Sequence, residues 1–402
     1  MIASPASKTV QPLRVLIVLC TLMGFASIST DFYLPAMPIM ATALRGGPGA
    51  MELTISGYLV GFSLGQLFWG PVGDRYGRRG PIGFGIGLFL IGSIGCALAR
   101  SAMDIVVWRV VQALGACAGV VLSRAMVRDL YGGERATQML STLIMVMAVA
   151  PLLGPILGAQ VLIHAGWRAI FWLLVVIGVA TGVGLATIPE TYRPGPEGAA
   201  SLGASFLAYG PLLRNRRVLF SAATGGFYYV GVYAYIAASP FAFITYHHVP
   251  ASLYGLLFAA GIVGIMAMNL VNVRLGPRFG GLRIMRAGAL IAAAGGLVFC
   301  LFARTGFGGL WGLVAPSFVF ISASGLIVAN SIGRALQSAP AAQAGSVSAL
   351  IGAAQYGGGI AGSAMVGALS DGTPGPLGWG LALAGLGAAF FAWAPQRPLE
   401  TG

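Results

Sequence analysis

The chain has 402 residues, of which 57% are hydrophobic and 8% are charged, with a mean hydropathy of +0.86. An average soluble domain carries about 25% charged residues, so this composition excludes an ordinary water-soluble fold. The net charge of +13 does not point to nucleic acid, because basic residues in a membrane protein chiefly fix its orientation. We therefore expect a lipid bilayer, and no nucleic acid, as a partner of the chain.

Apolar segments that can cross a membrane recur along the whole sequence. A helix needs about 20 apolar residues to span the hydrocarbon core. Twelve such segments lie at 13–38, 53–71, 82–99, 104–127, 138–163, 168–188, 218–245, 253–273, 285–303, 309–332, 345–369 and 376–394. The first is too long for a secretory signal and has no small-residue cleavage site, so we expect it to be retained as a helix.

One polar stretch divides these segments into two sets of six. Residues 189–217 are rich in proline and glycine and carry six charges, which is typical of a linker outside the bilayer. We predict an all-α membrane protein with an N-terminal six-helix bundle over 1–190, a linker over 191–217 and a C-terminal six-helix bundle over 218–402. Parallel repeats of six helices are a transporter architecture.

The basic residues are distributed unevenly between the two sides of the predicted bundle. Eighteen of the 23 lysines and arginines fall on the side of the N-terminus. Cytoplasmic loops carry such an excess, so we predict a multi-pass protein of the bacterial inner membrane with the linker and both termini in the cytoplasm.

Asp31 is the one carboxylate that these boundaries place clearly inside a helix. An ionisable residue at membrane depth is costly and is a functional candidate by default. Arg109, five residues into the fourth predicted helix, lies at a comparable depth, so the two side chains can pair. The pair is interpreted as a proton switch; a fixed salt bridge, or an Asp31 hydrated at the outer rim, stays open as an alternative.

The loop between the second and third predicted helices resembles the signature loop of the major facilitator superfamily, GxxxDRxGRR. The residues that carry the resemblance are Gly70, Asp74, Arg75, Gly77, Arg78 and Arg79. It implies that Asp74 latches the two halves by facing the N-terminal end of the eleventh helix, and that the arginines pair with Asp129. The second-half copy, Arg278-Phe279-Gly280, is degenerate at Pro277, so one complete latch is expected.

Two further patterns narrow the resemblance. Arg109, Gln112 and Gly115 match RxxQxxG, and Gly154, Pro155 and Gly158 match the antiporter motif of helix five. Gly154 and Gly158 share one helix face, which on its own indicates only close packing.

Together with the segment from Asp31 to Pro38 and with Trp167-Arg168, these patterns resemble the Bcr/CflA-type drug:proton antiporters. Ala113 and Ala159 replace glycines of that group. The resemblance implies proton-coupled export of small amphipathic drugs, such as chloramphenicol-like antibiotics, by a monomer. It thereby implies antibiotic resistance.

Several aromatic and amide side chains are candidates for the substrate cavity: Tyr33, Gln112, Tyr229, Tyr233, Gln355 and Tyr356. Tyr229 and Tyr233 share a helix face that suits flat aromatic ligands. Tyrosines also populate interfacial belts, and Gln355 and Tyr356 beside three glycines are equally typical of a packing seam.

No pattern of an enzyme, a cofactor or a metal site is found. The four cysteines lie in apolar runs without ligand spacing, and no Walker sequence appears, so we expect a secondary active transporter. Two alternatives remain: a facilitated or proton-linked transporter of a small metabolite on the same fold, and a membrane sensor built on that scaffold. The antiporter motif argues against the first, and the short linker against the second.

Overall fold

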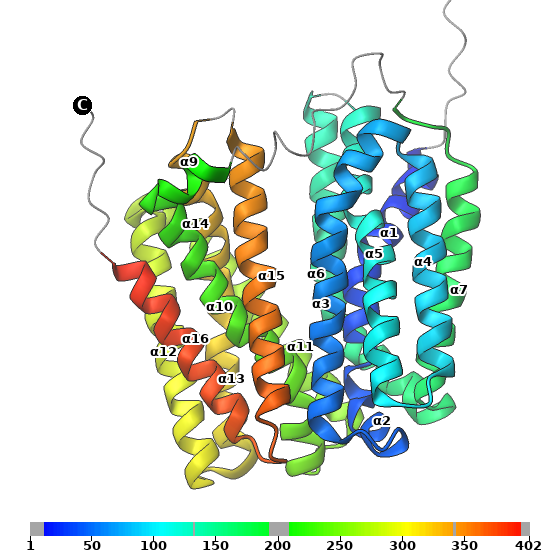
Figure 1. Cartoon of the computed structure of the whole chain (residues 1–402). Helices are drawn as coiled ribbons and strands as arrows, with labels where there is room; N and C mark the ends of the chain where they lie inside the picture. Colours follow the sequence, from blue (N-terminus) through cyan, green and yellow to red (C-terminus); the bar gives the residue numbers. More distant parts are fainter. Residues whose placement is uncertain (1–11, 132, 193–208, 341–342, 395–402) are drawn as a thin grey trace, which may run out of the picture.

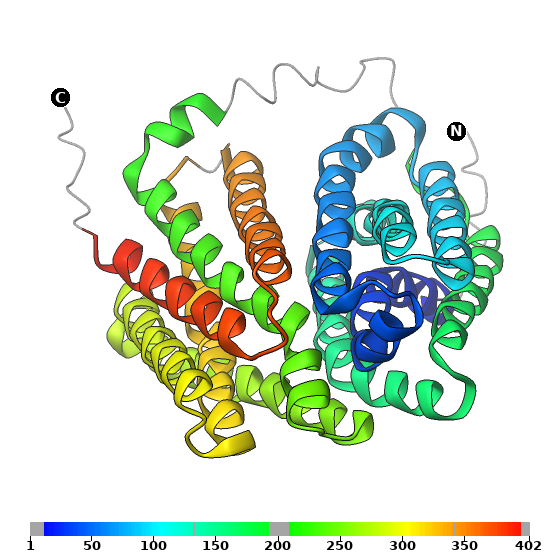
Figure 2. The same ribbon diagram turned by 60° about the horizontal axis from the view of Figure 1, so that its bottom comes forward.

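The computed structural model describes residues 12–131, 133–192, 209–340 and 343–394, and every regular element within them is helical. Two bundles stand side by side (Figures 1 and 2). The N-terminal half contains α1 (Pro12–Asp31), η1 (Leu34–Ala36), α2 (Met37–Ala43), α3 (Gly47–Tyr76), α4 (Arg79–Leu98), α5 (Ala102–Leu130), α6 (Gly133–Ala165) and α7 (Trp167–Ala186).

The second bundle is built from the part of the chain that follows residue 208. It contains α9 (Tyr209–Arg214), α10 (Arg216–Pro240), the π-helical η2 (Phe241–Tyr246), α11 (Ala251–Phe279), α12 (Gly281–Thr305), α13 (Gly309–Ser322), α14 (Ser324–Gln337), α15 (Ala344–Ala368) and α16 (Gly375–Trp393). The predicted all-α fold is confirmed.

The predicted segments differ from the helices chiefly at breaks and ends. The first segment is interrupted after Asp31, where a turn leads into η1 and Pro35, because proline removes a helical hydrogen-bond donor. The tenth segment is split at Ala323 into α13 and α14. Part of the predicted linker, 209–214, is the helix α9, whereas 193–208 lies outside the described residues.

Within the described residues, nine helices are long and apolar enough to cross a membrane, judged by length and composition. The helices α3, α6 and α15 are not among them. They pack at the contact between the two halves, α3 against α15 and α6 against α11.

The two ends of the molecule differ in charge. We call the end at which α3 closes with Arg75 and α10 begins with Arg216 the arginine-rich end, and the other, near Gly47, the opposite end. The halves touch from mid-helix to the opposite end: the Phe62 and Tyr356 rings lie 5.3 Å apart, and the Ser56 and Ser363 hydroxyls are 2.8 Å apart. These contacts close the opposite end of the molecule.

Candidate transport site

Arg109 is fully buried in the N-terminal half and is held from several sides. Its Nη1 donates to the Ser29 carbonyl oxygen and to Gln112 Oε1, both at 2.7 Å. The guanidinium lies 4.5 Å from the centre of the Tyr33 ring and 4.2 Å from that of Tyr58. Such cation–π contacts are worth about 0.5–2 kcal/mol each, so α1, α3 and α5 together fix one buried positive charge.

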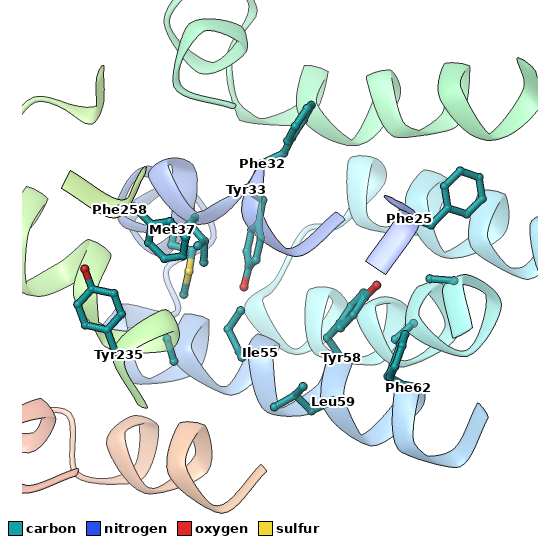
Figure 3. Close-up of a cluster of buried hydrophobic side chains, with 14 of the residues drawn as sticks. Phe25, Phe32, Tyr33, Met37, Ile55, Tyr58, Leu59, Phe62, Tyr235 and Phe258 are labelled. Carbon is teal, nitrogen blue, oxygen red and sulfur yellow. The ribbon is translucent and has the colours of Figure 1, made fainter. Parts of the chain in front are cut away.

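Two of the predicted cavity residues belong to this support and not to an open cavity. Tyr33 is fully buried, and its hydroxyl bonds to Thr54. Gln112 is also buried, and its amide nitrogen donates to Ser93 Oγ at 2.8 Å. Figure 3 shows the Tyr33 and Tyr58 side chains within the apolar cluster that surrounds them. Both predicted residues therefore position Arg109.

Asp31 ends α1 and is 5% exposed. In the described part of the chain no ion pair joins it to Arg109, although Arg109 is within electrostatic range. The tyrosines Tyr233 and Tyr254 of the other half are also within electrostatic range of this carboxyl group. Asp31 and Arg109 are therefore buried near each other without forming the expected ion pair. The Asp31 carboxyl group also lies close to the contact between the two halves.

The glycines of the predicted antiporter motif pack directly on this region. A Cβ atom on Gly154 would lie 2.6 Å from the Asp31 Cβ, and one on Gly158 would overlap the Phe32 carbonyl oxygen. Between them, Ile156 contacts Gly255 of α11 in the other half. The motif therefore brings α6 against the end of α1 and against the second bundle at once.

Glu52 is a buried carboxylate that the sequence analysis missed. It is 3% exposed, interacts with Ser370, and has one carboxylate oxygen without a hydrogen-bond partner in the described structure. The predicted segment began one residue later, at 53, and so placed it outside the membrane. Pro48 at the start of α3 was the available signal, because proline favours the first turn of a helix.

The remaining cavity candidates gather in the C-terminal half. The Tyr229 and Tyr233 rings lie 5.9 Å apart, and both tyrosines interact electrostatically with Tyr356. All three are partly exposed. Gln355 is buried, and its amide nitrogen has no hydrogen-bond partner among the described residues. The side chains of α10 and α15 therefore offer aromatic surface and a free polar group.

At the opposite end, apolar side chains of the two halves meet. Met37 of α2 lies beside Phe258 of α11 and near Tyr235 of α10 (Figure 3), and the three belong to one buried cluster. This apolar contact complements the polar Ser56–Ser363 pair on the neighbouring helices.

The signature loop forms a compact charge cluster at the arginine-rich end. Arg78 Nη1 lies 2.6 Å from Asp74 Oδ1, and its Nε lies 2.9 Å from Asp129 Oδ2. The predicted pairing of an arginine of the loop with Asp129 is present. Gly77 has φ +87°, a left-handed conformation that glycine adopts without strain, and Gly70 has open space around its Cα.

The contact between Asp74 and the N-terminal end of α15 is not formed among the described residues, where Asp74 pairs within its own half. Arg75 lies over Tyr76, 5.6 Å from the ring centre, and Arg79 Nη2 donates to the Ala186 carbonyl oxygen at 2.8 Å. The latch between halves stays a prediction for another conformation.

Glu190 is a second residue that the sequence analysis missed. Its carboxylate accepts the backbone N–H groups of Arg78 at 2.8 Å, Arg79 at 3.0 Å and Thr191 at 3.0 Å. Burial acts to raise the pKa of Glu190, but these backbone hydrogen bonds outweigh burial and lower it. The carboxylate caps the positive N-terminal end of α4 and ties it to the end of α7.

Replacing Glu190 with alanine should lower the free energy of unfolding by about 1–3 kcal/mol, because two amides at the start of α4 lose a charged acceptor. The Glu190 pKa is lower in the folded chain than in the unfolded one, so its contribution is complete above about pH 4.3 and is lost on acidification. Thermal unfolding of the purified protein across pH measures this. The Glu190→Gln variant keeps a hydrogen-bond acceptor but removes the charge, and so measures the contribution of the charge alone. Equal stability of wild type and both variants at neutral pH would contradict the capping role of Glu190.

Comparison with known proteins agrees with this architecture. Residues 18–363 match the Major Facilitator Superfamily. The chain is 32% identical over 362 residues to "Uncharacterized MFS-type transporter YdgK" of Bacillus subtilis, covering 88% of this chain and 87% of that protein. It is 28% identical over 350 residues to the "Bicyclomycin resistance protein homolog" of Haemophilus influenzae, covering 86% and 87%.

A third relative and one solved structure complete the comparison. The "Chloramphenicol resistance protein" of Pseudomonas aeruginosa is 31% identical over 305 residues, covering 73% of this chain and 70% of that protein. The crystal structure of a D-xylose–proton symporter has a TM-score of 0.74 at 16% identity, covering 94% and 97%. The structural likeness shows the fold, and the relatives confirm the resemblance to drug-resistance transporters.

Proposed function

The chain belongs to the Major Facilitator Superfamily, and from that membership we propose that it exports small amphipathic drugs in exchange for protons, with Asp31 and Arg109 as the coupling residues. In this proposal the protein lies in the bacterial inner membrane as a monomer, with the arginine-rich end in the cytoplasm. The printed names of two relatives, which concern bicyclomycin and chloramphenicol, support drugs as the cargo.

The observation that carries the proposal is the position of Asp31. It is buried against Gly154 of the antiporter motif, within range of Arg109, and near Tyr233 of the other half. A buried carboxylate is stable when it is protonated or faces a cation. Protonation of Asp31 therefore changes its attraction to Arg109 at the place where the two bundles separate and meet.

A transport cycle follows from this arrangement. With the opposite end closed, a drug enters from the arginine-rich end and lies against Tyr229, Tyr233 and Tyr356, whose rings suit flat amphipathic molecules. Opening of the opposite end releases the drug and admits a proton to Asp31. Return of the bundles then delivers the proton inward, so that the proton gradient drives export.

The proposal is tested by expressing the chain in a drug-sensitive bacterial host and measuring growth on chloramphenicol, florfenicol, bicyclomycin and cationic dyes. We expect resistance to at least one compound, together with low drug accumulation that a protonophore reverses. A well-expressed chain that gives no resistance, or that accelerates drug uptake in oriented vesicles, would favour the metabolite transporter.

Replacing Arg109 with lysine keeps the charge but removes the planar group that contacts two rings and two acceptors. A lysine ammonium has no planar surface to lie against the Tyr33 and Tyr58 rings at once, and losing one such contact costs roughly 1.4 kcal/mol, so we expect about a tenfold slower drug efflux from a folded protein. Efflux rates in proteoliposomes with an imposed pH gradient measure this. Arg128→Lys, an exposed residue near the other end of α5, is the matched control; unchanged efflux in Arg109→Lys would exclude a positioning role for the guanidinium.

A further inference from the structure

We propose that Glu52 is a proton-binding site that joins the two halves at the opposite end of the molecule, so that closing this end takes up a proton from that side of the membrane. The inference rests on one part of the proposed function, namely that the two bundles open and close the opposite end. It depends neither on the identity of the cargo nor on Asp31.

Glu52 lies on the side of α3 that packs against α15 of the other half (Figure 1). About one turn before it, a Cβ atom on Gly49 would overlap the Gly367 carbonyl oxygen. About one turn after it, the Ser56 hydroxyl lies 2.8 Å from that of Ser363. Residues three and four apart share a helix face, so Glu52 lies between two close contacts that must separate when this end opens.

The Glu52 carboxyl group is removed from water without a cation beside it. The residue is 3% exposed, Ser370 of the other half hydrogen-bonds to it, and its Oε2 has no hydrogen-bond partner among the described residues. The charged residue within electrostatic range is Asp371, which is also acidic. Because an unpaired buried charge costs far more than a buried neutral carboxyl group, Glu52 is stable in this closed state when it carries a proton.

The surroundings of Glu52 supply no compensating positive charge in the part of the chain that the structure describes. The adjoining helices α2 and α15 contain no charged residue. The other charged or histidine residues on the elements around α3 at this end do not act on Glu52, and they are Arg45, Arg100, Asp104, His247, His248 and Arg304.

Asp371 keeps its own charge and so opposes a second one on Glu52. The Thr373 hydroxyl and backbone N–H donate to Asp371 Oδ1 at 2.7 and 2.8 Å. These hydrogen bonds, the hydroxyl's first, lower the pKa of Asp371, which is exposed at the end of the loop that follows α15. Like charges repel, so Asp371 adds to the cost of ionising Glu52 while the halves are in contact.

Opening the opposite end exposes Glu52 to water, where a glutamate loses its proton above about pH 4.3. Closing therefore binds one proton that the open state does not hold. By linkage, the ratio of closed to open protein should fall about tenfold for each unit of rising pH wherever the open state is ionised and the closed state is protonated. In the proposed cycle a proton enters from this side before the end closes, so protonation of Glu52 would favour that step.

The test measures opening of the opposite end against pH in the purified full-length protein without drug. Spin labels are attached at Met103→Cys and Phe307→Cys, exposed positions of the two halves at this end, after the four native cysteines are replaced with alanine. The Asp31→Asn background removes the proposed coupling residue from the titration. We expect the closed-to-open ratio to fall by up to about tenfold per unit as the pH rises from about 6 to about 9. A ratio that is independent of pH would overturn the inference.

Two variants locate the effect. Glu52→Gln keeps the shape of the side chain and a hydrogen bond to Ser370 but cannot ionise, so this end should stay closed over the same pH range. Asp104→Asn changes another acidic residue of the same end and should keep the pH dependence of the parent protein. An unchanged pH dependence in Glu52→Gln would assign the proton to another group and overturn the site.

A second measurement covers the case in which Glu52→Gln does not fold. The infrared absorption of a protonated carboxyl group is then followed in the Asp31→Asn protein, and it should disappear as the label distances lengthen. No such band in the closed protein would count against the inference. A chain that closes with a proton but confers no drug resistance would contradict the export proposal alone, and drug resistance without pH-dependent closing would contradict this inference alone.

Discussion

Replacing Asp31 with asparagine should reduce pH-gradient-driven drug efflux by about tenfold or more while leaving drug binding within about twofold of wild type. Asparagine has the same shape as aspartate but cannot bind and release a proton, so drug export is no longer coupled to proton entry along the gradient. Because Asp31 packs against Gly154, the change preserves the volume at a crowded contact. Drug-dependent proton movement in proteoliposomes is the direct measurement.

The control for this variant is Asp104→Asn, in the first turn of α5, where the residue caps the helix and asparagine can still accept the backbone hydrogen bond. It should transport like wild type. Efflux that still follows the pH gradient in Asp31→Asn would remove Asp31 from the mechanism. Glu52, the other carboxylate that is less than a tenth exposed within the described residues, would then be the candidate proton carrier.

Replacing Gly158 with leucine should prevent the N-terminal half from packing, at a cost of more than about 3 kcal/mol. A Cβ atom at this position would overlap the Phe32 carbonyl oxygen and lie 2.9 Å from the Phe32 Cα. The obstacle is backbone, which cannot rotate away as a side chain can. The yield of monodisperse protein and its unfolding temperature measure the effect.

Gly87→Leu on α4 is the matched control, since a Cβ atom there would meet nothing within 4 Å and leucine favours a helix more than glycine does. It should be at least as stable as wild type. A Gly158→Leu protein of normal yield and stability would show that α6 is not in close contact with the end of α1. It would also contradict the proposed packing of the antiporter motif against Asp31.

The helical architecture could be predicted from sequence because it depends on local composition. A segment in lipid must satisfy its own backbone hydrogen bonds, so a run of about 20 apolar residues specifies a helix without reference to the rest of the chain. The signature loop is equally local in sequence, and the expected pairing of one of its arginines with Asp129 is present, whereas the Arg78–Asp74 pair was not predicted.

The residues of the candidate site could be predicted only in part, because the rotation of each helix about its axis and its burial determine which side chains are in contact. Arg109 was identified as a buried charge, but its hydrogen-bond partners on Ser29 and Gln112 and the Tyr58 ring follow from the packing of α1 and α3 against α5. Glu190 reaches the amide of Arg78 from 112 residues away. No spacing rule relates such positions.

By itself, then, the sequence determined the all-α membrane architecture and the charged loop at Asp74 and Arg78, since each depends on residues close together in the chain. The tertiary structure alone decided that Tyr33 and Gln112 support Arg109 and that Gly154 packs directly against Asp31. These contacts join helices far apart in sequence, and only the rotation and packing of each helix bring them together.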